Sequence, residues 1–390
     1  MGRFDAVIVG AGAAGLMCGL TAAGRGRRIL ILERNRGPGA KILISGGGRC
    51  NFTNREAPPE RFLSTNPHFC KSALSRFPPQ AFIAMVERHR IAYHEKTLGQ
   101  LFCDGSAREI LTMLLDECAA ARVDLRTNVQ INEVSHDGRF RVVTSHGDFA
   151  APKLVLASGG LSIPKIGASG FAYDIVRRFG LPIIEPRPGL VPFRLAGDQL
   201  ELVRLLSGNA VEAEVSRGRQ KFRESVLFTH RGLSGPAILQ ISSYWREGQT
   251  IAVDLGPDRD VETYLKKRKR ERPRAELKTL LAEIIPARVA EAFASGYPAT
   301  GAANLSDRVI AGVAERLRRW QVTPSETEGW AKAEVTVGGI DTAGVSSKTM
   351  EARGVPGLFV IGEAVDVTGW LGGYNFQWAW SSGFAAGQAI

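Results

Sequence analysis

The chain has 390 residues, 44% of them hydrophobic and 23% charged, a composition typical of soluble globular proteins. This length exceeds one compact core, so a single small domain is excluded and two or three domains are expected. The net charge of +11 fits anionic ligands or nucleic acid, although it also fits solubility alone.

Five cysteines are scattered through the chain, and none of them belongs to a C-x-x-C pair. The odd count and the lack of a disulfide framework predict a reducing, cytoplasmic location and argue against dithiol redox chemistry. No spacing of histidine, cysteine and acidic residues indicates a metal site. The uncharged stretch 6–23 is interrupted by glycines and preceded by Asp5, so we predict neither a membrane span nor a signal peptide there.

The first predicted elements are a buried strand over 6–9 and a helix over 13–23, joined by a glycine turn. Gly10, Gly12 and Gly15 give the spacing G-x-G-x-x-G. In this motif the first glycine allows the turn, the second lets backbone approach a pyrophosphate, and the third lets the helix pack on the strand. The helix N-terminus then attracts the phosphates. The alternative is a glycine-rich α/β turn without a ligand.

A second predicted strand, over 28–32, is followed by Glu33, which lies 23 residues after Gly10. In dinucleotide-binding folds an acidic residue about 20 residues after the motif hydrogen-bonds the ribose. We therefore predict a dinucleotide site. Its expected residues in this part of the chain are Gly10, Ala11, Gly12, Ala13, Ala14, Gly15, Glu33 and Arg34.

Residues 37–54 form a glycine-rich loop in which three consecutive glycines precede a cluster of small polar residues. Bare backbone and small polar groups suit a polyanion or a flat ring system. An ordinary glycine loop is the alternative. The predicted ligand contacts in this loop are Lys41, Ser45, Gly46, Gly47, Arg49, Cys50, Asn51 and Thr53.

Helices are expected next over 79–90 and 107–122, with strands over 123–131, 140–144 and 153–157. The last of these strands runs into Ser158, Gly159 and Gly160, a second place where backbone can meet the ligand.

Four prolines between 182 and 192 mark a domain crossing. We predict one discontinuous nucleotide-binding domain over 1–189 and 333–390, a β-rich insert over 190–253 and a helical insert over 254–332. A basic run over 266–274 holds seven positive charges. We interpret the run as a solvated helix face, with an RNA or anion contact as the alternative.

The chain resembles the BaiN-like family of FAD-dependent oxidoreductases, whose FAD domain is of the glutathione-reductase type. The matching segments are 10–15, 41–54, 228–236 and 362–377. The resemblance implies an α/β fold with a Rossmann-like FAD-binding domain, split by an inserted β-rich and helical domain. It also implies that the backbone of Val129 meets the adenine and that Ala157, Ser158, Gly159 and Gly160 line the phosphate and ribityl side. Further implied contacts near the C-terminus are Gly362, Glu363, Asp366, Gly373, Tyr374 and Asn375.

Segment 372–375 opens the last predicted helix. A helix N-terminus aimed at the flavin ring would stabilise the negative charge of the reduced ring. The catalytic candidates are His230, Cys50 and Tyr374. A loop-packing histidine, a packed thiol and a core aromatic are the respective alternatives.

NAD(P)H is expected at most as a transient reductant, because the insert has no second G-x-G-x-x-G; residues 167–172 are a poor match. The leading hypothesis is an FAD-dependent oxidoreductase that transfers hydride to or from a small organic molecule, with no nucleic-acid partner. One alternative is a flavin-dependent RNA-modifying enzyme, suggested by the charge and by the run 266–274. Another is a non-enzymatic flavin-bound redox or interaction module. The oligomeric state stays open.

Overall fold

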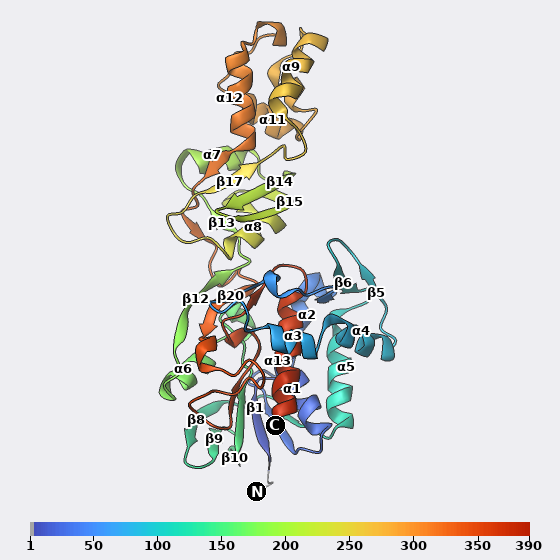
Figure 1. Ribbon diagram of the computed structural model, residues 1–390, viewed down its shortest axis with the longest axis vertical. Coiled ribbons are helices and arrows are strands. Elements are labelled where there is room, and N and C mark those ends of the chain that lie inside the picture. Colours follow the sequence, from blue (N-terminus) through green and yellow to red (C-terminus); the bar gives the residue numbers. More distant parts are fainter. Residues whose placement is uncertain (1–3) are drawn as a thin grey trace. The chain divides into compact units, whose positions relative to one another are not determined.

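The computed structural model describes residues 4–390 and divides into two compact units (Figure 1). Unit 1 contains Met1–Arg187 and Val335–Ile390, and unit 2 contains Pro188–Glu334. Within the described residues, no helix is both long and apolar enough to cross a membrane.

Unit 1 is built on a parallel sheet of five strands within residues 4–390. Their order across the sheet is β21 (Leu358–Val360), β11 (Lys153–Leu156), β1 (Ala6–Val9), β2 (Ile29–Leu32) and β7 (Asp124–Arg126). The central strands β1 and β2 read AVIV and ILIL and are buried throughout. Continuous apolar strands of this kind are expected where both faces of a parallel sheet are covered. This is the Rossmann-like FAD-binding fold that the sequence predicts.

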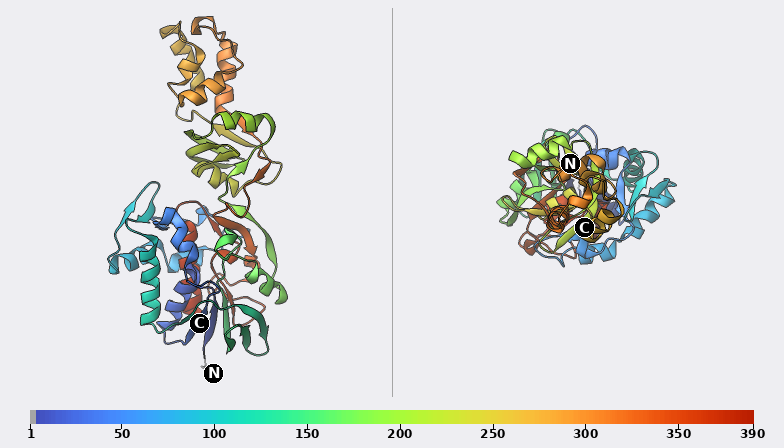
Figure 2. Two further views of the ribbon diagram at one scale, coloured as in Figure 1. Left: turned by 180° about the vertical axis from the view of Figure 1, so that it is seen from behind. Right: turned by 90° about the horizontal axis from the view of Figure 1, so that it is seen from above.

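The two faces of this sheet carry different layers (Figures 1 and 2). Helices α1 (Ala13–Ala23), α13 (Tyr374–Ala389) and α5 (Ala107–Ala120) lie on one face, and α1 and α13 pack side by side although they come from opposite ends of the chain. The antiparallel strands β8 (Ile131–His136), β9 (Phe140–Thr144) and β10 (Gly147–Ala151) cover the other.

The remaining strands of unit 1 form small sheets around this core. They are β3 (Asn51–Asn54), β4 (Phe62–Leu63), β5 (Tyr93–Glu95), β6 (Gln100–Cys103), β12 (Ile183–Gly189), β20 (Val335–Ile340) and β22 (Thr368–Gly369). The other helices are α2 (Ala40–Ile44), α3 (Lys71–Arg76), α4 (Pro79–Arg88) and α6 (Phe171–Arg178).

The prediction of a single strand over residues 123–131 is wrong. Strand β7 ends at Arg126 and β8 begins at Ile131, and the two belong to different sheets. Asn128 lies between them with a φ of 58°, a left-handed conformation that asparagine tolerates better than most residues. Backbone bonds hold this turn beside the end of β2, since Asn128 N donates to Asn35 O and Val129 N donates to Glu33 O.

Unit 2 contains a seven-stranded sheet whose described pairs are all antiparallel. Its order is β18 (Trp320–Val322), β17 (Ile251–Asp254), β14 (Ala210–Arg217), β15 (Gln220–Thr229), β16 (Gly232–Ser234), β13 (Phe193–Arg194) and β19 (Glu326–Thr327). Its helices are α7 (Gly197–Leu205), α8 (Pro236–Ser242), α9 (Val261–Glu271), α10 (Leu277–Leu281), α11 (Ala287–Ala294) and α12 (Asp307–Arg318). Helices α9 to α12 thus interrupt the sheet in sequence, between β17 and β18.

Candidate functional site

The glycine turn after β1 is closely packed at two of its three glycines. Gly10 has a φ of 106°, and a Cβ there would lie 2.5 Å from Ala157 O. A Cβ on Gly15 would lie 1.9 Å from Gly10 O. No side chain fits at these distances, so both glycines are required by the fold itself, whether or not a ligand is bound.

Gly12 is different, because a Cβ built there meets nothing within 4 Å. It is the N-cap of α1, makes no side-chain capping bond, and the first turn of the helix carries no acidic residue. Among the described residues, α1 thus has no side-chain cap at its N-terminus, and the space beside Gly12 is open. A helix N-terminus of this kind binds phosphate groups.

Glu33 lies beside the glycine turn that follows β1. Its buried carboxylate accepts hydrogen bonds from Ala11 N through Oε2 and from Asn35 N through Oε1, both at 2.8 Å. Each carboxylate oxygen has a second lone pair that a ribose hydroxyl can use. Val129 bonds to the backbone of the same residue, which places it beside the turn, whereas the side chain of Arg34 is exposed.

Residues 157–160 face the glycine turn from β11. The Oγ atom of Ser158 is buried and has no hydrogen-bond partner among the described residues. A Cβ on the neighbouring Gly159, whose φ is 77°, would meet nothing within 4 Å. Since buried hydroxyls are almost always hydrogen-bonded, an orphaned one beside open space fits a polar ligand. These observations are compatible with a dinucleotide lying along the turn.

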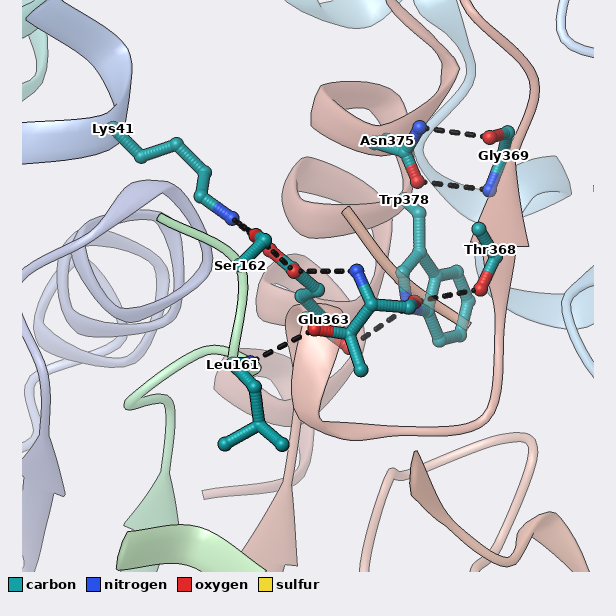
Figure 3. A network of polar contacts seen from close by, with 10 residues as sticks. Lys41, Leu161, Ser162, Glu363, Thr368, Gly369, Asn375 and Trp378 are labelled. Carbon is teal, nitrogen blue, oxygen red and sulfur yellow. Dashed lines mark hydrogen bonds and ion pairs between the residues drawn. The ribbon is translucent and has the colours of Figure 1, made fainter. Parts of the chain in front are cut away.

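A polar network joins α2 to the segment after β21 (Figure 3). Lys41 Nζ forms an ion pair with Glu363 and donates to Ser162 Oγ at 2.6 Å. Glu363 Oε1 also accepts from Ser162 Oγ and from Thr336 N, each at 2.9 Å. Thr336 Oγ1 in turn accepts from Leu161 N at 2.8 Å. The polar groups of Lys41 and Glu363, both predicted ligand contacts, thus hold four chain segments together.

Asp366 lies buried a few residues beyond Glu363. Its Oδ2 accepts two hydrogen bonds from Thr65, from the backbone amide at 2.9 Å and from Oγ1 at 2.7 Å. All of the bonds that the structure gives to this carboxylate fall on that one oxygen, so Oδ1 remains available as an acceptor.

The loop before β3 and the start of α13 come together although about 320 residues separate them. A Cβ on Gly373 would lie 2.3 Å from the carbonyl carbon of Thr53. Thr53 Oγ1 donates to Gln377 Oε1 at 2.6 Å, and Asn51, with its amide oriented to satisfy its neighbours, accepts from Gly373 N at 3.1 Å. Asn375 bonds both backbone groups of Gly369 at 2.8 Å (Figure 3).

The glycine run itself is the exposed rim of this junction. Gly46 and Gly47 have left-handed φ values of 56° and 66°, and a Cβ on Gly47 would meet nothing within 4 Å. Ser45 Oγ donates to Ile42 O at 2.7 Å, and Arg49 is exposed. The exposed glycine run and the start of α13, which has no side-chain cap, therefore both lie beside strand β3.

The three catalytic candidates have unlike surroundings. Cys50 is fully buried, and burial raises the pKa of its thiol to about 12, which favours the packed-thiol alternative. Tyr374 is 2% exposed and its hydroxyl accepts from Arg61, whose guanidinium lies 5.3 Å from the Tyr374 ring centre. His230 is exposed in unit 2, in the turn between β15 and β16.

Several residues of the site are absent from the sequence-based prediction. Thr65, Ser162 and Thr336 bond the predicted carboxylates, and Arg61 bonds Tyr374. Each of these contacts joins residues that are distant in the chain. No local pattern in a single sequence signals such contacts.

The basic run 266–274 is largely neutralised within unit 2. Five of its seven cations, Lys266, Lys267, Arg268, Lys269 and Arg272, form ion pairs with carboxylates. Arg270 and Arg274 are exposed and have no ion-pair partner among the described residues. Most cations of the run therefore form ion pairs at the protein surface, which agrees with the interpretation as a solvated helix face.

Known proteins with similar sequences place this geometry in context. The chain is 50% identical to the ribosomal RNA dihydrouridine synthase of Escherichia coli (strain K12), over 100% of this chain and 98% of that protein. It is 43% identical to the protein of the same name from Haemophilus influenzae, over 98% of both chains. The 3-dehydro-bile acid delta(4,6)-reductase of Clostridium scindens is 27% identical, again over 98% of both. The resemblance to BaiN-like proteins thus holds only at the level of the wider family.

These relatives overturn two expectations. The main hypothesis of a small organic substrate, and the expectation of no nucleic-acid partner, are both contradicted by the names of the 50% and 43% identical relatives. The physical reason is that the glycine turn and the loops around it report the cofactor and not the molecule it reduces. Net charge, for its part, does not reveal where unpaired cations lie.

A solved structure and a family model agree with the fold. The 3-ketosteroid-delta4-(5alpha)-dehydrogenase of Rhodococcus jostii RHA1 is 14% identical, with a TM-score of 0.50, covering 99% of this chain and 97% of that one. The family model described as "HI0933-like protein Rossmann domain" matches residues 4–389. The chain therefore belongs to the HI0933-like family of Rossmann-domain proteins.

Proposed function

We propose that this protein is an FAD-dependent enzyme that reduces uridine to dihydrouridine in ribosomal RNA. One observation carries the proposal: the full-length identity of 50% to a ribosomal RNA dihydrouridine synthase. At that level, fold and site architecture are expected to be shared from end to end, so the chemistry of the relative is the best guide to the chemistry of this chain.

The structure supports FAD as the cofactor through open space at Gly12 and Gly159 and through the orphaned hydroxyl of Ser158. Bound FAD, once reduced, would supply a hydride to the C5–C6 double bond of uracil, and a proton would complete the saturation. The residues proposed to hold it are Gly10, Ala11, Gly12, Ala13, Ala14, Gly15, Glu33, Val129, Ala157, Ser158, Gly159, Gly160, Asp366 and Gly373.

Each part of the site has a distinct task in this proposal. The N-terminus of α1 binds the diphosphate, and Glu33 accepts hydrogen bonds from a ribose while its backbone partners keep the carboxylate fixed. Asp366 offers Oδ1 to a ligand hydroxyl. The N-terminus of α13 stabilises negative charge on the ligand near it. The Lys41–Glu363 pair positions these segments and does not itself act on substrate.

NAD(P)H enters this proposal only as a transient reductant. A second dinucleotide site of the Rossmann type needs a parallel sheet, whereas the seven-stranded sheet of unit 2 is antiparallel. Anaerobic addition of NADH or NADPH should bleach the flavin absorbance if either serves. An rRNA substrate also agrees with the cytoplasmic location that the cysteine content predicts.

The test uses purified protein and ribosomal RNA from a strain that lacks the enzyme. Protein with its flavin reduced by dithionite is mixed with this RNA, and dihydrouridine is measured by mass spectrometry of the digested nucleosides. The Gly12→Ala variant serves as the flavin-free control. If wild-type protein forms no dihydrouridine in free rRNA or in ribosomal subunits, the proposed function is wrong.

A further inference from the structure

Two of the large apolar side chains that the described chain exposes belong to the glycine-rich loop and to the neighbouring β5–β6 hairpin. Ile44, at the end of α2, is 46% exposed, and Leu98, in the turn of the β5–β6 hairpin, is 65% exposed. The hairpin projects from the body of unit 1 in both side views (Figures 1 and 2). Exposed apolar side chains are informative where they adjoin other groups suited to binding a partner.

An aromatic pair lies on the same hairpin. His94 and Phe102 are opposite one another across β5 and β6, and their rings are nearly parallel, with centres 6.1 Å apart and an interplanar angle of 16°. The Phe102 ring also packs on the glycine run, since a Cβ on Gly46 would lie 2.9 Å from its Cε1 atom. Lys96 Nζ stands 5.6 Å from the Phe102 ring centre. The hairpin thus presents planar rings together with a cation.

The hairpin itself carries Lys96, Glu95 and Asp104, and Arg49 and Arg55 adjoin it. Glu95 forms an ion pair with Arg55, and Asp104 Oδ1 lies 2.6 Å from His94 Nδ1. Lys96 and Arg49 form no ion pair with the residues that the structure describes. Arg49 is held beside the hairpin because Cys103 N donates to Arg49 O at 2.9 Å. Lys96 thus lies against the aromatic pair, and the backbone of Arg49 adjoins the same hairpin.

The hairpin is continuous with the proposed flavin site. Strand β6 pairs with β3, which lies against the start of α13. Gln100, at the start of β6, packs against the glycines that precede α13, since a Cβ on Gly372 would lie 3.0 Å from Gln100 Cγ. The hairpin therefore lies directly beside the exposed glycine run.

We propose that this hairpin surface binds the single-stranded rRNA nucleotides that flank the target uridine. The surface consists of Ile44, Arg49, His94, Lys96, Leu98 and Phe102. Proteins hold single-stranded RNA by stacking bases on aromatic side chains and by placing cations against the phosphates. The hairpin offers both kinds of group, the rings of His94 and Phe102 and the cation of Lys96. This inference rests on the proposed function, because it assumes an RNA substrate.

The experiment measures RNA binding and modification separately. Filter binding with labelled rRNA from a strain that lacks the enzyme gives the Kd and its salt dependence for wild type, Lys96→Ala, Leu98→Ala and Phe102→Leu. Loss of the phenylalanine ring should weaken binding on the order of tenfold, as expected for one stacked base. Loss of the lysine charge should weaken binding and lower the salt slope by about 1. Flavin absorbance should stay at the wild-type value in all three.

Two matched controls keep the result specific. Leu205→Ala removes a leucine in unit 2 that is 65% exposed, the same exposure as Leu98, and should leave RNA binding unchanged. Lys348→Ala removes an exposed lysine elsewhere in unit 1 and should do the same.

Wild-type affinity and salt slope in the hairpin variants would overturn the hairpin inference while leaving the proposed function intact. Normal binding of free rRNA with lower modification of ribosomal subunits alone would also overturn it, because the hairpin would then contact a ribosomal protein. If wild-type protein makes no dihydrouridine, the proposed function itself fails, whatever the variants do.

Discussion

Replacing Gly12 with alanine should empty the cofactor site without disturbing the fold. The residue has a φ of −84° and a ψ of −171°, which is extended backbone that alanine adopts freely. The new methyl group would meet no protein atom within 4 Å. It would instead occupy the space in which the proposed diphosphate approaches the backbone of α1.

The magnitudes follow from these two facts. In the free protein, alanine is a poorer N-cap than glycine but restricts the unfolded chain, and each effect is at most about 1 kcal/mol and opposite in sign. Stability should thus change by less than about 1 kcal/mol. For FAD, displacing the diphosphate loses at least two charge-assisted hydrogen bonds of about 1.5–3 kcal/mol each. The affinity should fall by a factor on the order of 10²–10⁴.

The assay pairs flavin content with thermal denaturation. Absorbance near 450 nm per protein chain reports retention of FAD. The melting temperature of the flavin-free variant should stay within about 2–4 °C of that of flavin-free wild-type protein. Gly15→Ala is the contrasting variant, because its Cβ would lie 1.9 Å from Gly10 O. That clash should destabilise the fold itself by about 1–3 kcal/mol or more. Stoichiometric flavin in purified Gly12→Ala protein would refute the placement of the diphosphate at this turn.

Three further predictions concern other parts of the site. Glu33→Gln leaves one of the two backbone amides that the carboxylate binds without an acceptor. The free energy of unfolding should therefore fall by about 1–3 kcal/mol, measured by urea denaturation, and flavin retention should drop, measured by absorbance. Unchanged values would contradict the assignment of Glu33 to the ribose. Lys41→Met should lower the free energy of unfolding by about 1–3 kcal/mol, because Glu363 then keeps its charge without a cation. The double variant Lys41→Met, Glu363→Gln should recover part of this loss. Strictly additive effects of the two substitutions would show that the pair is not coupled. Cys50 has a folded pKa of about 12, above the ordinary value of 9.0, so its contribution to stability is complete below pH 9 and is lost as pH rises toward 12, at about 1.4 kcal/mol per pH unit. Cys50→Ala should remove that part of the alkaline slope in urea denaturation between pH 9 and 10.5 and should retain dihydrouridine formation; a large loss of activity with normal flavin content would restore Cys50 as a catalytic candidate.

Much of the fold was predictable from local patterns in the sequence. Strands β1 and β2, helix α1 and the glycine turn were predictable because each depends on a few adjacent residues: apolar runs for buried strands and glycines where Cβ atoms would clash. The break in the strand predicted over 123–131 was not visible in the sequence. The residues there alternate like a strand, and only tertiary packing decides that β7 and β8 join different sheets.

The functional site divides in the same way. By itself the sequence predicted a dinucleotide-binding turn, an acidic residue spaced to contact a ribose, and a glycine-rich loop, because these signals lie within single short segments. Only the tertiary structure decided that Glu363 is held by Lys41 and Ser162, that Thr53 meets Gln377, and that most of the run 266–274 is paired with carboxylates. Those outcomes depend on contacts between segments far apart in the chain. Charge and polarity are local properties of a sequence, but whether a charged group is free to bind a ligand depends on which neighbours the fold brings to it.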